Sequence, residues 1–464
     1  MLMAKINNFL TKIIVYYYGL RYKHVDNDFE WIKKDGRSLF FNTASNSSLG
    51  RKVIGIVVGY GWGYCDALIP LMKYIKDNTN AVIITLLTCD NAGERRKLDK
   101  ERWKDILSNS DAILFNNSIT HRPFRGNKRK IKNERKKKLY FSSLEKNLCG
   151  ILFDAYLVCD EFEQESCAMW LWNNQPKAKS CGIDPCTYTD IEVDYSVFDI
   201  SPYLSINYDY YCMSAKQRQK TIPLKFLNRF IYTGSPRTDY WFIKKREEEA
   251  LKFRSRISKK TDKIVAFAFP NLYYTERFYN DLRSSFREAL YELAEDNYAF
   301  LLKFHPKNDM RTIRQFIKEY FPSKTKFRIV TCDNTTLSFV SDVVVNVGIS
   351  DSRPDFAVSR KFFIEYCDEK VIMMHCKEHG FSLEIDGNRR FWSDRGMSTI
   401  AKDKKELVAS IRKELLSPTT GADYDSIFPK DRNVSKIVSD YLLTGIWSDQ
   451  VYKYSKRALL SNHE

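Results

Sequence analysis

The residues best suited to bind a ligand or to take part in catalysis are a histidine and a lysine that follow a predicted strand. The segment Leu301–Lys307 has the sequence LLKFHPK, so His305 and Lys307 come at the carboxyl end of an apolar run. Ligands of open α/β sheets bind outside the carboxyl ends of the strands. His305 can donate a hydrogen bond or a proton to a phosphate oxygen, and Lys307 supplies a point charge. The pattern indicates a phosphate-binding position, and a histidine satisfied within the fold is the alternative.

A second candidate follows the apolar run Val343–Val347. The chain continues as GISDS from Gly348, with hydroxyls at Ser350 and Ser352 on either side of Asp351. Backbone N–H groups, hydroxyls and the start of a following helix together attract a diphosphate. The segment therefore predicts a diphosphate-binding loop. An ordinary helix N-cap at Ser350 or Asp351 is compatible with that role.

A glycine-rich turn in the first half of the chain is a third candidate. Gly59, Gly61 and Gly63 lie between the apolar run Val53–Val58 and a helix predicted over 66–76. Glycines let the backbone approach a ligand closely. A dinucleotide fingerprint needs G-x-G-x-x-G and an acidic residue after the next strand, and this spacing differs. The pattern disfavours a dinucleotide-dependent dehydrogenase and leaves two interpretations, an acceptor-side ligand loop and a tight turn without a ligand.

The sequence gives little reason to expect a metal site. His375, Cys376 and His379 lie close together, but no second cluster of ligand types accompanies them. A surface loop is the simpler interpretation of this group. We therefore expect neither a metal nor another cofactor.

Two alternations of predicted strands and helices position these candidates. Apolar runs that predict strands lie at 53–58, 81–87, 112–115, 151–158, 264–269, 299–304, 327–330, 343–347 and 362–366. Helical patterns lie at 276–294, 310–320, after Ser350, at 404–416 and at 434–443. Such alternation predicts an α/β chain with two Rossmann-like domains. The expected bounds are 1–20 for an N-terminal helix, 21–231 for the first domain with a basic insertion at 121–138, 232–262 for a linker, 263–445 for the second domain and 446–464 for a tail. The alternative for the helix at 434–443 and the segment 447–460 is that they cross back onto the first domain.

Composition restricts the class of protein and of partner. The 464 residues include 75 basic and 58 acidic ones, a net charge of +17, and 44% are hydrophobic. That hydrophobic share suffices for two cores, and the positive charge favours an anionic partner. Residues 121–138 hold ten Lys or Arg against one Glu, which predicts an exposed segment. Eleven cysteines without a regular framework are typical of reduced thiols in the cytosol.

The N-terminal segment predicts an amphipathic helix. One helical face of residues 1–20 is apolar and consists of Ile6, Leu10, Ile13 and Tyr17. Lys5 and Lys12 interrupt the apolar character, which disfavours a spanning helix, and no small-residue cleavage site follows. A helix lying in a membrane interface fits this pattern, and so does a helix packed on its own domain.

Four blocks in this order resemble the CDP-glycerol glycerophosphotransferase family of teichoic-acid and capsule polymerases. They are YTGSPRTD at 232–239, LLKFHPK at 301–307, SDVVVNVGISDS at 341–352 and FFIEYCD at 362–368. The resemblance covers about residues 150–370 and implies a GT-B fold, with two Rossmann-like domains and a cleft between them. It also implies contacts to the donor's nucleotide diphosphate by Arg237, His305, Lys307, Gly348, Ser350, Asp351 and Ser352.

The chain departs from that family at its proposed base. The family has a Trp-His-Gly-x-Pro-x-Lys motif, whereas this chain has LWNNQPK at 171–177, with Asn173 in place of the histidine and Lys177 retained. Asparagine cannot accept a proton at neutral pH. The family's Thr-Asp-Tyr-Ser-Ser is likewise replaced, here by Asn346–Ser352. We therefore expect a divergent relative, with His305, Asn173 and Lys177 as catalytic candidates. Alternative bases are Asp66, Asp154, Asp160 and Glu161.

The expected activity is transfer of a nucleotide-activated sugar or polyol phosphate onto a cell-envelope polysaccharide. The basic run and the N-terminal helix would hold the enzyme, cytoplasmic and peripheral, at the inner face of an anionic membrane carrying a lipid-linked or glycan acceptor. Positive groups at the donor site would stabilise the leaving diphosphate without a metal. Nucleic-acid binding and a catalytically inactive scaffold are the alternatives. Nucleic acid is not the expected partner, because zinc-finger spacing and an RNP signature are missing from the sequence.

Overall fold

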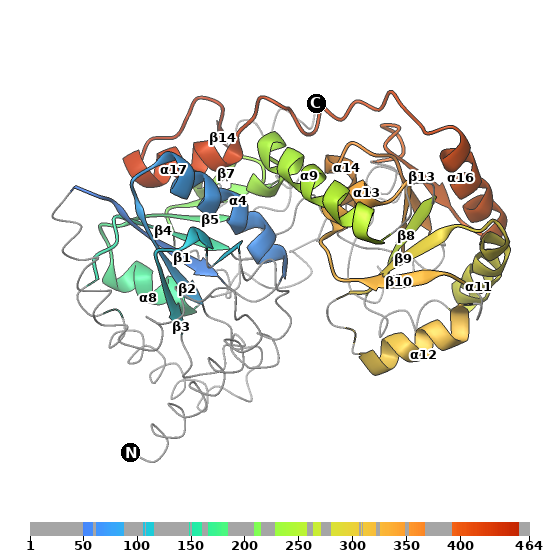
Figure 1. Ribbon diagram of the computed structural model, residues 1–464. Coiled ribbons are helices and arrows are strands. Elements are labelled where there is room, and N and C mark those ends of the chain that lie inside the picture. The colour runs from blue at the N-terminus through green and yellow to red at the C-terminus, as the bar shows by residue number, and fades with distance from the viewer. Residues whose placement is uncertain are drawn as a thin grey trace, which may run out of the picture. The chain divides into compact units, whose positions relative to one another are not determined.

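The structure is a computed structural model, and it is shown in Figure 1. The residues it describes are 50–58, 62–87, 105–106, 108–115, 148, 151–159, 166–183, 208–214, 228–257, 263–270, 280–305, 308, 310–321, 325–348, 352–366 and 392–453. The predicted helix over 1–20, the basic insertion at 121–138 and the group His375–His379 lie outside these residues.

The described chain divides into two units at Arg237 and Thr238, and it returns to the first unit from Asn433 onward. The first unit contains an eight-stranded sheet in the order β14-β7-β6-β5-β4-β1-β2-β3, parallel except for the pair of β14 with β7. Its strands are β1 Val53–Val58, β2 Val82–Leu87, β3 Ala112–Phe115, β4 Ala155–Cys159, β5 Lys179–Ile183, β6 Tyr210–Met213, β7 Phe230–Tyr232 and β14 Tyr452–Lys453. Its helices are α4 Trp62–Asn78, α8 Ser166–Asn174 and α17 Val434–Thr444.

The second unit contains a six-stranded parallel sheet in the order β10-β9-β8-β11-β12-β13. Its strands are β8 Ile264–Ala268, β9 Ala299–Lys303, β10 Phe327–Val330, β11 Val343–Val347, β12 Phe363–Tyr366 and β13 Ser398–Ala401. Its helices are α9 Tyr240–Ile257, α11 Asn280–Glu295, α12 Met310–Tyr320, α13 Asn334–Val340, α14 Arg353–Val358 and α16 Lys404–Leu416, and the short 3-10 turn η4 spans Pro236–Thr238 at the boundary.

The central strands β1, β4, β8 and β11 are buried along their whole length, as their continuous apolar sequences predict for parallel strands covered on both faces. One face of the second sheet packs on α11, α12 and α16. On the other face, the ring of Phe356 in α14 packs 5.7 Å from that of Phe363 in β12. The fold class is therefore the predicted one, an α/β chain with two mainly parallel sheets.

Two stretches differ from the sequence-based assignment. Residues 240–257, assigned to a linker, form α9, which packs on α13 and buries Phe242, Ile243 and Ala250. Its many charged residues conceal this apolar stripe. Helix α17 falls within the bounds given to the second domain, and the alternative, a return to the first domain, is the observed arrangement. It packs on α4 in the first unit and buries one face there.

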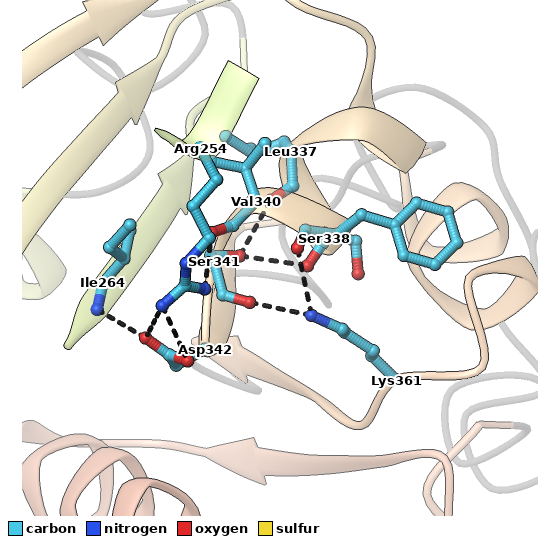
Figure 2. A network of polar contacts seen from close by, with 9 residues as sticks. Arg254, Ile264, Leu337, Ser338, Val340, Ser341, Asp342 and Lys361 are labelled. Carbon is cyan, nitrogen blue, oxygen red and sulfur yellow. Dashed lines mark hydrogen bonds and ion pairs between the residues drawn. The ribbon is translucent and has the colours of Figure 1, made fainter. Parts of the chain in front are cut away.

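Aspartates at the beginning of parallel strands hold the sheets in register. Asp342 precedes β11, and its carboxylate accepts a 2.8 Å hydrogen bond from the N–H of Ile264, the first residue of β8. Figure 2 shows that Nη2 of Arg254 in α9 donates to both oxygens of this carboxylate, at 2.9 and 3.1 Å, while its Nη1 donates to the carbonyl of Val340 at 2.8 Å. Lys361 donates to the carbonyl of Ser341 at 2.9 Å, and burial lowers the pKa of this lysine.

The same arrangement recurs in the first sheet. Asp111 accepts from the N–H of Ile83 at 2.9 Å, and Asp154 accepts from the N–H of Val53 at 2.9 Å. Asp209 accepts from the N–H of Ser180 at 2.8 Å. Each of these aspartates directly precedes a strand, and each satisfies a backbone donor of the neighbouring strand. We call these three residues and Asp342 the register aspartates.

Replacing Asp342 by alanine should destabilise the second unit by about 2 kcal/mol, because a charged acceptor of a backbone N–H is lost. Arg254→Ala should also destabilise this unit, and the double variant should lose less than the sum of the two single losses. Urea denaturation of the four proteins measures this coupling. Additive losses would contradict the shared network of Figure 2.

Alkaline pH should weaken the fold through buried tyrosines. Burial raises the pKa of Tyr156 in β4, of Tyr441 in α17 and of Tyr424 well above the ordinary value. These hydroxyls stay protonated in the folded chain, whereas the unfolded chain ionises them above about pH 10. The free energy of unfolding should therefore be unaffected by these groups below that pH and fall above it. Tyrosinate absorbance should show a fraction that titrates only when the protein unfolds, and uniform titration in the folded state would contradict this.

Candidate functional site

The second sheet has a topological switch point between β8 and β11. The chain runs from β8 outward to β9 and β10, and then returns to place β11 and β12 on the other side of β8. Open α/β sheets bind ligands outside the carboxyl ends of the strands at such a point. We call this edge, where the six parallel strands end, the carboxyl edge of the second sheet. The opposite edge, with Asp342, is the amino edge.

His305 lies at this carboxyl edge, two residues after the end of β9, and is half-buried. Its carbonyl accepts a 2.9 Å hydrogen bond from the N–H of Asn308, which is buried and donates through its side chain to the carbonyl of Pro270 at 3.2 Å. Asn308 therefore ties the loop after β9 to the loop after β8. Sequence analysis did not single out this residue. Lys307 lies outside the described residues.

Gly348 follows β11 at the same edge and has a left-handed backbone, with φ 73°. Its N–H donates to the carbonyl of Tyr366 at 2.9 Å, and its own carbonyl accepts from the side chain of Asn346 at 3.2 Å. Glycine is the residue that adopts this conformation without a steric penalty. Within the described residues, the side-chain oxygen of the buried Asn346 has no hydrogen-bond partner.

The helix after Gly348 is short. α14 has six residues, so its dipole contributes little to the binding of a diphosphate. The N-cap position is held by Ser352, not by Ser350 or Asp351, and its side chain makes no capping hydrogen bond. Ser350 and Asp351 lie outside the described residues. The backbone turn at Gly348 and the strand edge are therefore the stronger features of this site.

A buried ion pair fixes the start of α14. Arg353 lies 3.2 Å from the carboxylate of Glu365 in β12, and Ser398 of β13 donates to the same carboxylate at 2.6 Å. Glu365 is the register partner of Asn346, so the two polar side chains are neighbours on one face of the sheet. Sequence analysis missed this group. The signal was one polar residue inside each of the apolar runs VVVNV and FIEY.

The first unit repeats the switch-point topology. Strands β2 and β3 lie on one side of β1 and β4 lies on the other. Gly63 is in the first turn of α4, which begins at Trp62, whereas Gly59 and Gly61 lie outside the described residues. Asp66, a candidate base, is half-buried in the first turns of the same helix, close to the carboxyl end of β1. The glycine turn thus follows β1, the strand after which a ligand-binding loop of the first sheet is expected.

Two catalytic candidates lie away from these carboxyl edges, whereas Arg237 follows the carboxyl end of β7. Asn173 and Lys177 are exposed between the last turn of α8 and the start of β5. Gln175 between them donates to the carbonyl of Ile151, ahead of β4, so this segment belongs to the amino edge of the first sheet. Arg237 is half-buried in η4 at the boundary of the units.

The candidate bases also separate. Asp154 is a register aspartate that pairs with Lys52 at 2.9 Å, and its structural role at the amino edge argues against its use as a base. Asp160 and Glu161 lie outside the described residues.

Among the residues that the structure describes, no group of His, Cys, Asp and Glu is arranged to hold a metal ion. In the same part of the chain, no helix is long and apolar enough to cross a membrane.

Solved structures share this architecture. A UDP-GlcNAc 2-epimerase from Methanocaldococcus jannaschii matches with a TM-score of 0.55 and 15% identity, over 85% of this chain and 100% of that chain. A UDP-GlcNAc 2-epimerase from Neisseria meningitidis, bound to UDP-GlcNAc, gives 0.50 and 13% over 84% and 99%. The glycotransferase of kitacinnamycin gives 0.50 and 10% over 84% and 98%. The chain matches no protein-family model and no curated protein. At these identities the likeness shows the fold, which is GT-B-like.

Gly348→Val should cost roughly 1–2 kcal/mol of stability, because the left-handed backbone places Cβ against the following carbonyl. Gly421 has φ 92° with open space around it, so Gly421→Val is a matched control with similar strain. If Gly348 shapes a ligand loop, only its variant should also lose thermal stabilisation by nucleotides. Equal ligand responses in the two variants would remove Gly348 from the site.

Proposed function

We propose that the chain is a GT-B transferase that binds a nucleotide-activated donor at the carboxyl edge of the second sheet. The observation that carries this proposal is the switch point between β8 and β11, which brings His305, Gly348 and Ser352 to one edge. Two of the structurally similar proteins are named as nucleotide-sugar enzymes, and one of them was solved with UDP-GlcNAc bound. A nucleotide diphosphate is therefore the ligand class that we assign to this edge.

The transferred group is a sugar or a polyol phosphate, as in the family that the four sequence blocks resemble. An acceptor hydroxyl attacks the activated group, the bond to the leaving nucleotide breaks, and the nucleotide carries away the negative charge. His305 donates a hydrogen bond to a phosphate oxygen and stabilises that charge. The positive charge of Lys307 acts in the same direction.

The acceptor hydroxyl must lose its proton during transfer. Asn173 cannot take it, and Asp154 is engaged with Val53 and Lys52. Asp66, Asp160 and Glu161 remain the candidates for the base, because the chain places all three shortly after β1 or β4. The donor site in the second unit and the acceptor site in the first unit then follow the division of the chain.

The acceptor that we propose is a cell-envelope polysaccharide, capsular or teichoic-acid-like, carried on a lipid or growing as a free glycan. The enzyme would work from the cytoplasmic face of the membrane as a peripheral protein. This part of the proposal rests on the sequence blocks shared with the polymerase family, the net charge of +17 and the apolar helical face in residues 1–20.

A nucleotide-sugar epimerase is the second candidate, because proteins of that name have the same architecture as this chain. An epimerase converts its nucleotide sugar without an acceptor. The two functions are thus separated by whether free nucleotide accumulates only when an acceptor glycan is present.

The first experiment is a thermal-shift screen of the purified chain against CDP, CMP, UDP, GDP and sugar-nucleotide donors. A ligand at about 100 times its dissociation constant stabilises the folded state by roughly 2.7 kcal/mol, which is readily measured. We expect stabilisation by one nucleotide base over the others. CDP or CMP would favour a polyol-phosphate or CMP-sugar donor, and UDP or GDP an ordinary glycosyltransferase.

His305→Ala and Ser352→Ala should each lower the apparent affinity for the stabilising nucleotide about tenfold, which corresponds to the loss of one charge-assisted hydrogen bond. Ser426→Ala is the matched control. Its hydroxyl donates to the carbonyl of Asp423. The neighbouring Asp425 pairs with Arg360, which precedes β12, so this control lies at the amino edge of the second sheet. Wild-type affinity in both edge variants would contradict the proposed donor site.

A further inference from the structure

The outer edge of the second unit combines a basic helix with exposed apolar side chains. Helix α12 leads directly into β10, the last strand of the sheet on that side. Figure 1 shows the two in yellow and orange at the margin of the unit. The ring of Phe321, just after α12, lies 5.6 Å from that of Phe327 in β10, so the helix and the edge strand share one surface.

The apolar face of α12 is fully engaged with the core. Ile313 and Tyr320 are buried in the hydrophobic core of the second unit. Phe316 packs against Phe269 at 5.1 Å and Phe304 at 5.8 Å, which directs this flank of the helix toward the middle of the sheet. Helix α12 therefore cannot insert its apolar face elsewhere without unfolding, and any partner must contact the outward face.

The outward face of α12 is basic. Arg311, Arg314 and Lys318 are exposed and follow one another at helical spacing, so they form a single row. None of the three has an ion-pair partner within the described part of the chain. Glu319 is the one acidic residue of the helix. By contrast, α16 in the same unit pairs Arg412 and Lys404 with acidic residues of α11.

Apolar side chains accompany this row. Met310, at the start of α12, is 50% exposed, and Phe327 and Ile329 of the edge strand are 36% and 39% exposed. The phosphates of a nucleic acid would be matched by the charges alone, and its backbone offers no apolar contact to Met310 and Ile329. The headgroup region of an anionic bilayer matches both, since basic side chains pair with phosphates while short apolar groups enter the interface.

We propose that these six residues, Met310, Arg311, Arg314, Lys318, Phe327 and Ile329, form a docking surface for a bilayer that contains anionic phospholipid. We call it the α12–β10 surface. It shares no residue with the segments 1–20 and 121–138, and it lies in the unit to which we assign the donor. Docking is shallow and electrostatic, because the helix stays packed on its core.

The test is co-sedimentation of the full-length chain with vesicles of phosphatidylcholine containing phosphatidylglycerol, and with phosphatidylcholine vesicles alone. The wild-type chain should bind the anionic vesicles and should be released at high salt. The triple variant R311E, R314E and K318E should bind them with a roughly tenfold lower partition coefficient. Met310→Gln should lower the coefficient by a smaller factor, about threefold, without any change of charge.

A matched control reverses three exposed lysines around α16, as K402E, K405E and K413E. It produces the same change in net charge next to β13, at the opposite side of the sheet from β10, so this variant should retain most of the binding. Equal losses in both triple variants would show that only overall charge matters, and unchanged binding in the α12 variant would assign docking to other segments. A dimer that dissociates on reversal of α12, without vesicle binding, would make a second copy the partner. Each of these three results would overturn the proposal.

Discussion

The hydrogen bond from a backbone N–H to the carboxylate of a register aspartate is the constraint on which the rest of the structure depends. Side chains alternate across a strand, so a slip of one residue would turn every apolar side chain to the wrong face. Asp342 excludes such a slip between β8 and β11, and its own N–H donates back to Ile264 at 2.8 Å. The two central strands are therefore locked at their beginning, which sets where they end.

This lock makes the amino edge of each sheet structural, opposite the edge at which we propose that ligands bind. At the amino edge, the carboxylates are engaged by backbone N–H groups and by cations such as Arg254 and Lys52. At the carboxyl edge, the strands end at levels fixed by the lock, and their loops start beside one another. Asp154 illustrates the consequence. Its carboxylate accepts from Val53 and Lys52 at the amino edge, away from the strand ends where α/β sheets bind ligands.

The sequence predicted the elements with long apolar runs, and it placed β3, β10, β11, α12 and α16 at their observed bounds. It missed β5, β6 and β7, because KSCGI holds polar residues and a glycine, and the apolar runs YYCM and FIY have only four and three residues. The register aspartates were recognisable in principle, since each directly precedes an apolar run. Their role, however, depends on a neighbouring strand that is distant in the sequence. Of the candidate site, the positions of His305 and Gly348 followed from strand ends, whereas Asn308 and the Arg353–Glu365 pair depend on tertiary contacts.

That buried pair bears on function more than on stability. Removing two charges from water costs about as much as their attraction returns, and apolar side chains of equal volume often stabilise a core better. The pair of Arg353 and Glu365 is therefore poorly explained by a need for stability. It does hold the first residue of α14 against β12, only a few residues beyond the left-handed turn at Gly348. Buried polar groups that stability does not require thus gather at the carboxyl edge of the second sheet. The donor site that we propose gives them a physical reason, because a loop that binds a charged ligand must keep one shape.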